Sequence, residues 1–226
     1  MEPTPGDGFI MPDGEFIALE DVQRMFEEAR KVYTTTEEIV GLMVELGREC
    51  AGKKKFTGAQ AYFEKALELG GSDEITSRCL LALGQIKENL GDCEAAARWY
   101  ERAFTLKPGS DEVWYFLNNN LGYCLNRLGR HAEALEKCAR AVAIDPKRHN
   151  GHKNLGVALE GLTRYGEAAL SYLAAAELCP WDGRALQLLE SLLTSHPAIE
   201  EDSPGLRDRV RYAAMRASSP GLNSRN

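Results

Sequence analysis

The chain has 226 residues, of which 44% are hydrophobic and 27% charged, a composition typical of globular proteins. Its net charge of −7 argues against nucleic acid as a partner. No stretch approaches the roughly 18 apolar residues of a membrane helix, and no signal peptide follows Met1. We therefore expect a cytoplasmic protein that binds neither nucleic acid nor membranes.

The amino-terminal extension, residues 1–17, contains a turn signal. Residues 9–10 and 16–17 are apolar and flank a Pro-Asp-Gly sequence at residues 12–14, which predicts a small β-hairpin. Apolar residues then recur at helical spacing, which predicts a capping helix within residues 18–36. We expect the hairpin either to cover this helix or to fold back into a binding groove.

Four Leu-Gly pairs mark an internal repeat. Twelve and nineteen residues after each glycine stands an alanine, sixteen after it a bulky or buried residue type, and twenty-four after it a helix-stopping Gly or Pro. The four glycines are Gly47, Gly84, Gly122 and Gly156. The residues sixteen positions later are Phe63, Tyr100, Cys138 and Tyr172. Four copies in one register are not expected by chance.

This pattern resembles the tetratricopeptide repeat, and the resemblance covers residues 37–182. It implies an all-α fold, a right-handed α-α superhelix in which glycine in the first helix of each pair lets the second helix approach closely. The predicted pairs are 37–52 with 55–69, 74–90 with 93–106, 111–128 with 131–144, and 148–162 with 165–178. Capping helices within 183–217 and a disordered tail at 218–226 complete the predicted chain.

The sequence departs from the repeat pattern in two ways, and each departure leads to a structural prediction. The glycines of the second and third copies lie 38 residues apart instead of 34, which predicts a helix lengthened by about one turn in the third copy. Asn118 and His152 replace the tryptophan that is usual near the start of a unit. We expect looser packing at these two polar residues.

The resemblance implies that first helices line a concave, peptide-binding groove. The candidate groove residues are Arg78, Gln85, Asn89, Asn119, Asn120, Tyr123, Arg127, Asn150, Lys153 and Asn154. Asn120 and Asn154 share one frame position, and an amide carries both a donor and an acceptor, so a file of Asn could pair with the backbone of an extended peptide. In that case the amides are exposed in the free protein and add nothing to its stability. The alternative is that Asn-Leu-Gly is frequent in this repeat and the groove is merely wet.

Other site chemistries find little support in the sequence. The carboxylate clamp of related co-chaperones needs cations that neither register of the repeats supplies. His149 and His152 lie three residues apart, as metal ligands can, but no third ligand is apparent nearby. The six cysteines form no Cys-x-x-Cys pair, so we expect them to pack as small hydrophobes. No catalytic motif is present, and we expect neither an enzyme nor a cofactor.

The function that these observations favour is a non-enzymatic adaptor whose groove holds an extended segment of a protein partner. The alternative is a structural or assembly subunit that uses its ends or convex face, with the groove idle or filled by its own amino terminus. Residues 1–45 hold eleven acidic and three basic residues, whereas 204–226 hold five arginines and one aspartate. Such charged blocks are either solvated surfaces or complementary ends that allow self-association.

Overall fold

A computed structural model describes most of the repeat region and part of each end of the chain. The described residues are 8–10, 16–18, 24, 27–28, 30–33, 35–199 and 203–218. They fall into two compact units, residues 1–113 and 114–226, and each unit is considered by itself. No helix among these residues is both long and apolar enough to cross a membrane.

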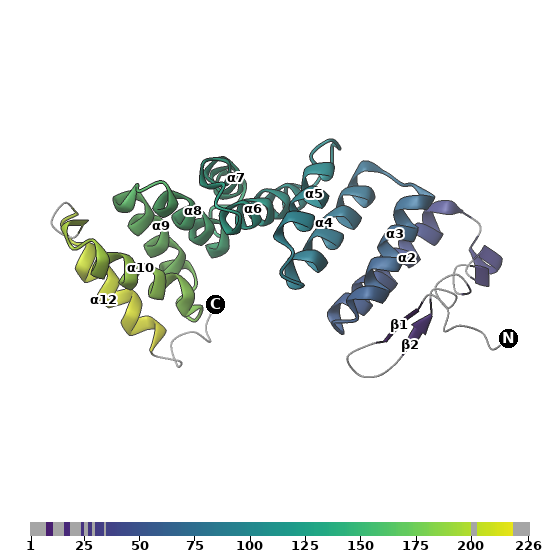
Figure 1. Cartoon of the computed structure of the whole chain (residues 1–226), viewed down its shortest axis with the longest axis horizontal. Helices are drawn as coiled ribbons and strands as arrows, with labels where there is room; N and C mark the ends of the chain where they lie inside the picture. The colour runs from purple at the N-terminus through teal and green to yellow at the C-terminus, as the bar shows by residue number, and fades with distance from the viewer. Residues whose placement is uncertain are drawn as a thin grey trace. The chain divides into compact units, whose positions relative to one another are not determined.

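Unit 1 contains two short strands and two pairs of helices (Figure 1). Its elements are β1 (Gly8–Ile10), β2 (Phe16–Ala18), α2 (Thr36–Gly52), α3 (Phe56–Leu69), α4 (Asp73–Asn89) and α5 (Cys93–Ala103). The strands pair antiparallel with Phe9 opposite Ile17; the turn expected between them lies outside the described residues. Of the capping helix expected within 18–36, residues 24, 27–28 and 30–32 are helical, whereas 19–23, 25–26, 29 and 34 lie outside the described residues.

The main helices in the described part of unit 2 follow in chain order, and the first of them begins at the end of unit 1. They are α6 (Asp111–Arg127), α7 (His131–Ile144), α8 (His149–Gly161), α9 (Tyr165–Leu178), α10 (Gly183–Ser195) and α12 (Leu206–Ala217). In both units the ends of the paired helices lie within three residues of the predicted ones; the largest difference is at α5, which ends at Ala103. The predicted tail lies outside the described residues apart from Ser218.

The glycine of each pair is the point at which the two helices touch. A Cβ atom added to Gly84 would lie 2.2 Å from Cε1 of Tyr100, and one added to Gly156 would lie 2.5 Å from the Tyr172 ring. Both tyrosine rings are fully buried, so any side chain at either glycine would displace a ring from the core. The expectation that glycine permits close approach is confirmed.

Two of the four pairs add a hydrogen bond to this contact. The Tyr100 hydroxyl donates to the Glu88 carboxylate at 2.9 Å, and the Tyr172 hydroxyl donates to Glu160 at 2.6 Å. Burial raises the pKa of Glu88, while the bond from Tyr100 partly offsets that rise. Both glutamates stand four residues after the repeat glycine. The third copy has Asn126 at this position, opposite a cysteine.

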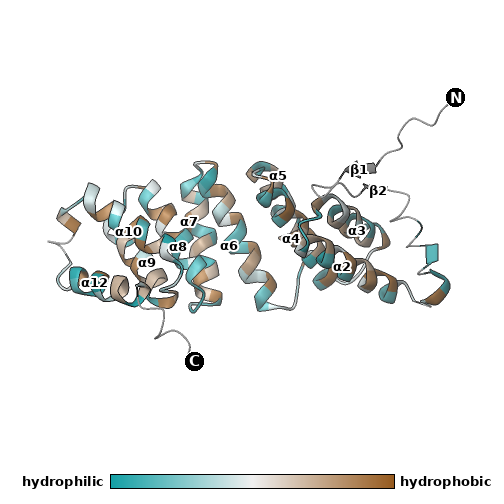
Figure 2. Ribbon diagram, turned by 90° about the horizontal axis from the view of Figure 1, so that it is seen from below, coloured by the Kyte–Doolittle hydropathy of each residue, from teal (hydrophilic) through white to brown (hydrophobic). Residues whose placement is uncertain are grey.

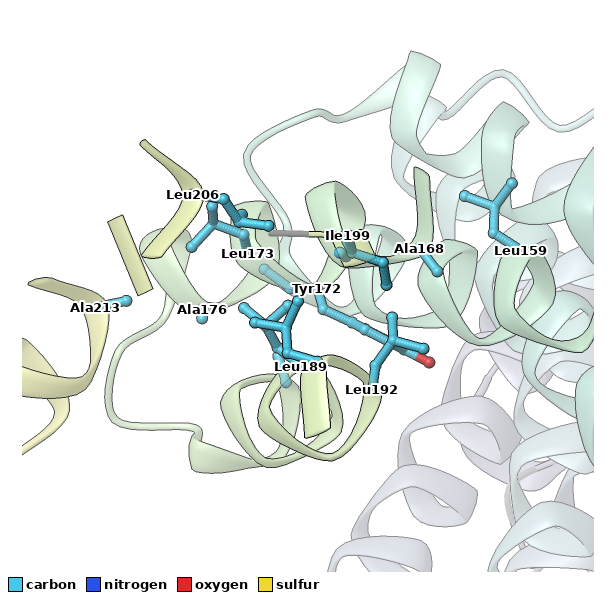
Figure 3. Packing of buried hydrophobic residues seen from close by; sticks show 14 residues of the cluster. Leu159, Ala168, Tyr172, Leu173, Ala176, Leu189, Leu192, Ile199, Leu206 and Ala213 are labelled. Carbon is cyan, nitrogen blue, oxygen red and sulfur yellow. The ribbon is translucent and has the colours of Figure 1, made fainter. Parts of the chain in front are cut away.

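Apolar (brown) and polar (teal) residues alternate along the helices (Figure 2), and the buried residues are mostly apolar. In unit 2 one apolar cluster joins α8, α9, α10 and α12. Leu189 and Leu192 of α10 pack with Tyr172 of α9, while Leu206 of α12 lies beside Leu173 (Figure 3). Burial of this kind is the main favourable term in folding.

Helix α12 closes the carboxyl end of unit 2. It packs against α9 and α10, and Ala213 on its inner face is buried. The guanidinium of Arg209 makes two hydrogen bonds to the Glu177 carboxylate of α9, at 2.7 and 3.0 Å. The narrow apolar stripe with arginines opposite thus covers the last helix pair, as solenoid ends require.

Both departures from the repeat pattern have structural consequences. Helices α2, α4 and α6 each have 17 residues, whereas α8 has 13. The expectation of a lengthened helix in the third copy is therefore wrong: α6 is longer than α8 alone, and the shorter α8 is the exception. Asn118 does not loosen the packing as expected: it is 3% exposed, and its Nδ2 donates to the Trp114 carbonyl at 2.8 Å.

The turn inside each helix pair requires a left-handed backbone conformation seven residues after the repeat glycine. Gly91 and Gly129 adopt it with φ of 81° and 74°, but Lys54 and Thr163 occupy the same position with φ of 58° and 60°. A β-branched residue is strained in this conformation, whereas glycine is not.

We therefore expect Thr163→Gly to raise the free energy of unfolding by about 1 kcal/mol, because it relieves a left-handed β-branched residue. Urea denaturation followed by circular dichroism measures this change. Gly129→Ala is the matched control and should lower stability by a similar amount. Equal stability of Thr163→Gly and the wild-type protein would show that the turn does not hold Thr163 in this conformation.

Candidate peptide-binding surface

Three of the ten predicted groove residues lie on α4 in unit 1. The Arg78 guanidinium is paired with Glu74 at 2.8 Å, so its charge is already matched. Asn89 is exposed, and its Nδ2 donates to the Gln85 carbonyl at 2.7 Å. These residues form local pairs along one helix and share no network with one another across helices.

Unit 2 holds the other seven predicted residues, and three of its amides form a chain. Asn154 Nδ2 of α8 donates to Asn119 Oδ1 of α6 at 3.1 Å. Asn119 Nδ2 in turn donates to Asn120 Oδ1 at 2.9 Å. Asn119 and Asn120 are each 8% exposed and Asn154 is 5% exposed. These hydrogen bonds tie α6 to α8 through buried side chains.

A fourth amide, Asn126, which the sequence analysis did not identify, forms a hydrogen bond to the backbone of this chain. Asn126 Nδ2 donates to the Asn154 backbone carbonyl at 2.8 Å, and Asn126 Oδ1 lies 3.2 Å from His131 Nδ1. Asn126 is the residue that replaces the glutamate of the Tyr–Glu pairs. The sequence could have indicated its role, because the third copy has a polar residue at this position but no tyrosine to bond with it.

The expectation that the amides are exposed in the free protein is wrong. Residues 118–120 are consecutive, and consecutive side chains on a helix point in directions about 100° apart, so they cannot all face a groove. Buried amides require partners, and these find them on neighbouring backbone and side chains. The amides are therefore part of the folded structure before any peptide binds.

A polar cluster lies beside the amide chain, at the start of α8 and α10. Arg184 makes two hydrogen bonds of 2.7 Å to the Asp182 carboxylate. His149 Nε2 lies 3.2 Å from the same carboxylate. Lys153 Nζ donates to Asn150 Oδ1 at 2.9 Å. Lys153 and Arg184 both carry a positive charge, whereas Asp182 carries one negative charge. The net charge of these three side chains is therefore positive.

The pKa shifts in the cluster have identifiable causes. The Arg184 hydrogen bonds hold the pKa of Asp182 well below its usual range. Burial lowers the pKa of His149, which keeps the imidazole mainly neutral at pH 7. Burial, followed by the nearby Arg184 charge, also lowers the pKa of Lys153. An anionic group that approached Lys153 would therefore relieve an unfavourable environment.

Tyr123 of α6 lies near the Arg184 guanidinium. The hydroxyl of Tyr123 accepts from Arg127 at 3.4 Å, and Arg127 is exposed. Side chains from α6, α8 and α10 therefore meet on one surface of unit 2. We call the set Tyr123, Arg127, Asn150, Lys153 and Arg184, with the amides Asn120 and Asn154, the first-helix surface.

The structure offers little for a metal or for thiol chemistry. His149 faces Asp182, whereas His152 Nε2 lies 2.9 Å from the Pro146 carbonyl, so the two imidazoles do not converge. Among the described residues, no group of three His, Cys, Asp or Glu side chains could hold a metal ion. The cysteines are free thiols, and burial raises the pKa of Cys79 to about 11 and that of Cys138 to about 12. Such thiols are poor nucleophiles.

Comparison with known families identifies the repeat. Two family models described as tetratricopeptide repeat match residues 38–108 and 81–149. The chain belongs to the tetratricopeptide repeat family. The resemblance seen in the sequence is confirmed, and with it the all-helical solenoid class.

Several curated tetratricopeptide repeat proteins are similar to part of the chain. Small glutamine-rich tetratricopeptide repeat-containing protein 2 of Mycosarcoma maydis is 32% identical over 111 residues, which are 48% of this chain and 30% of that protein. BBSome complex member bbs-4 of Caenorhabditis elegans is 26% identical over 126 residues, which are 53% of this chain and 26% of that protein. The chain thus spans less than a third of these relatives.

Solved structures with the same fold cover more of the chain. MamA from Desulfovibrio magneticus RS-1 superimposes with a TM-score of 0.64 at 17% identity, over 80% of this chain and 97% of that one. YrrB, described as a TPR protein with an unusual peptide-binding site, has a TM-score of 0.59 at 19% identity, over 89% and 97%. At these identities the likeness shows the fold alone.

We expect the buried amide chain to contribute to the free energy of unfolding. Asn154→Ala should lower the free energy of unfolding by about 1–3 kcal/mol, because it leaves Asn119 Oδ1 without its donor in a buried position. Asn89→Ala, which alters an exposed amide, should change it by less than about 0.5 kcal/mol. Urea melts of both variants measure the difference. Equal, small effects would mean that the Asn154 amide does not hold α8 to α6.

Proposed function

We propose that the chain is a non-enzymatic adaptor that holds an extended segment of a partner protein against the first-helix surface of unit 2. Membership of the tetratricopeptide repeat family supports a protein-interaction role in general. The observation that carries the finer proposal is the meeting of three successive first helices. Tyr123, Lys153 and Arg184 come from α6, α8 and α10, and both Tyr123 and Lys153 lie near the Arg184 guanidinium.

The chemistry of this surface suits an extended polypeptide with acidic side chains. The half-buried amide of Asn150 can serve backbone N–H and C=O groups, which every peptide carries whatever its sequence, whereas Asn120 and Asn154 are buried and bonded within the fold. Lys153 and Arg127 can pair with a carboxylate, and the half-buried position of Lys153 makes such a pair stronger than one in water. We infer a partner segment that is extended and contains at least one Asp or Glu.

A second candidate role, assembly with another copy of the chain, is supported by α12. Its outer face exposes 56% of Tyr212 and 57% of Met215 among arginines. This end is basic, whereas residues 1–45 are acidic, so two copies could associate head to tail. A concentration-dependent molar mass in light scattering, abolished by a double Tyr212→Ser and Met215→Ser variant, would support this role instead.

The adaptor proposal is tested with a peptide selected on the full-length protein from a random twelve-residue phage library. Lys153→Ala should weaken its binding by about 1.5–3 kcal/mol if Lys153 pairs with a peptide carboxylate. Arg140→Ala is the control, since it removes an exposed cation from the second helix α7. Isothermal titration calorimetry measures both affinities. Equal effects of Lys153→Ala and Arg140→Ala would place peptide binding away from the first-helix surface.

A further inference from the structure

Helix α9 is apolar around most of its circumference, yet one of its faces is exposed. Of its 14 residues only Glu167 and Glu177 are charged. The helix packs against α8, α10 and α12, but Leu170 remains 49% exposed and Leu178 39% exposed. A helix that is apolar all round is expected to be covered on every side. Within the described part of the chain, this face of α9 keeps an uncovered apolar surface.

The exposed face alternates small and large residues at a spacing of four, so its members share one side of the helix. We call them the α9 stripe: Gly166, Leu170, Ala174 and Leu178. A Cβ atom added to Gly166 would meet no described atom within 4 Å, so the surface is open there. In the second and third copies, the two middle positions of the same frame are exposed and charged: Arg98, Arg102, Glu136 and Arg140. Only the fourth copy has two apolar residues there.

An exposed tryptophan and an open pocket lie at the two ends of the stripe. Trp181 follows the carboxyl end of α9 and is 67% exposed. A pocket of about 530 Å³ lies at the amino end of α9. Its lining residues include Thr163, Tyr165, Gly166, His196, Ile199 and Ser203. The Tyr165 and His196 rings stack with 3.7 Å between their centroids, so part of the lining is aromatic.

We propose that the α9 stripe is an interface with a second copy of this chain, related by a two-fold axis level with residue 172. In such an antiparallel pair of helices, Leu170 faces the partner's Ala174 and Leu178 faces the partner's Gly166, and the reverse. Each leucine therefore meets a small residue, which makes the stripe complementary to itself. The same register sets Trp181 opposite the partner's Thr163, at the pocket. This interface lies apart from the first-helix surface and does not depend on peptide binding.

A tryptophan side chain suits the pocket chemically. Tryptophans that fill a pocket of the partner carry much of the binding energy at many interfaces. The rings of Tyr165 and His196 and the side chain of Ile199 offer it aromatic and apolar contacts. The indole N–H needs an acceptor when it is buried, and the hydroxyl groups of Thr163 and Ser203 can provide one. Because the axis is two-fold, the dimer contains this contact twice.

The charged residues beside the stripe are compatible with this pairing. The Arg164 guanidinium makes two hydrogen bonds of 2.7 Å to the Glu167 carboxylate, and Arg209 makes two to Glu177. The two-fold register brings these Arg–Glu pairs opposite each other, so no unmatched like charges meet. A neutral, self-complementary surface of this kind favours a second copy of the chain over a strongly charged partner.

The test measures the molar mass of the full-length protein by analytical ultracentrifugation over a range of concentrations. The wild-type protein should form dimers. Leu170→Lys should raise the dissociation constant of the dimer at least about 100-fold, because it buries an unpaired charge. Trp181→Ala should raise it about 30-fold, because it empties both pockets. Leu90→Lys is the matched control, since Leu90 is 60% exposed but lies in unit 1, and it should leave the dimer unchanged.

A mixture of two variants tests the register. Leu170→Lys and Ala174→Asp should each be monomeric alone, and circular dichroism shows whether both are folded. Mixed in equal amounts they should form a heterodimer. The two-fold register then sets the introduced lysine against the introduced aspartate at one contact and keeps Leu170 against Ala174 at the other.

Four results would overturn the inference. The first is a wild-type protein that stays monomeric at the highest concentration reached. The second is a dimer that Leu170→Lys and Trp181→Ala leave as stable as the wild type. The third is a mixture of the two monomeric variants that forms no heterodimer. The fourth is a dimer that is lost in the double Tyr212→Ser and Met215→Ser variant but kept in Leu170→Lys, which would place the assembly on α12 instead.

Discussion

The close contact between a bare glycine on each first helix and the second helix is the constraint on which the repeat depends. Gly84 and Gly156 lie so near Tyr100 and Tyr172 that no side chain could be added without moving a ring. This contact sets the distance between the two helices of a pair. The buried alanines on the second helix keep the same interface thin, so the two helices of each pair pack closely as one unit.

The third copy keeps the glycine but changes what surrounds it, and the candidate site follows from that change. Cys138 replaces the tyrosine beside Gly122, and Asn126 replaces the glutamate that would bind its hydroxyl. Asn126 then bonds to the Asn154 carbonyl in the next first helix. In the second and fourth copies, the side chain at this position forms a hydrogen bond within its own helix pair. In the third copy it forms a hydrogen bond from α6 to α8 instead, and Asn154, which accepts this bond, is also a member of the amide chain.

The regular part of the fold could be predicted from the sequence because one frame repeats four times. The helix ends and the glycine contact follow from that frame. The hydrogen-bond partners of individual polar side chains do not follow from the frame. Asn119 and Asn120 are adjacent in sequence, yet Asn119 bonds to α8 and Asn120 bonds to Asn119. The strained Thr163 was recoverable by comparison with Gly91 and Gly129. The cluster around Asp182 was not, because the repeat frame specifies no residue type at position 182, which is the amino-terminal cap of α10.

The side-chain amides of Asn119, Asn120 and Asn154 are already bonded to one another in the free protein. Solvent exchange of side-chain NH₂ protons, followed by nuclear magnetic resonance without any peptide, tests it most directly. We expect the NH₂ groups of Asn119 and Asn154 to exchange much more slowly than that of the exposed Asn89, because exchange requires the buried bonds to open. Equally fast exchange at all three residues would show that the chain of amides does not exist in solution.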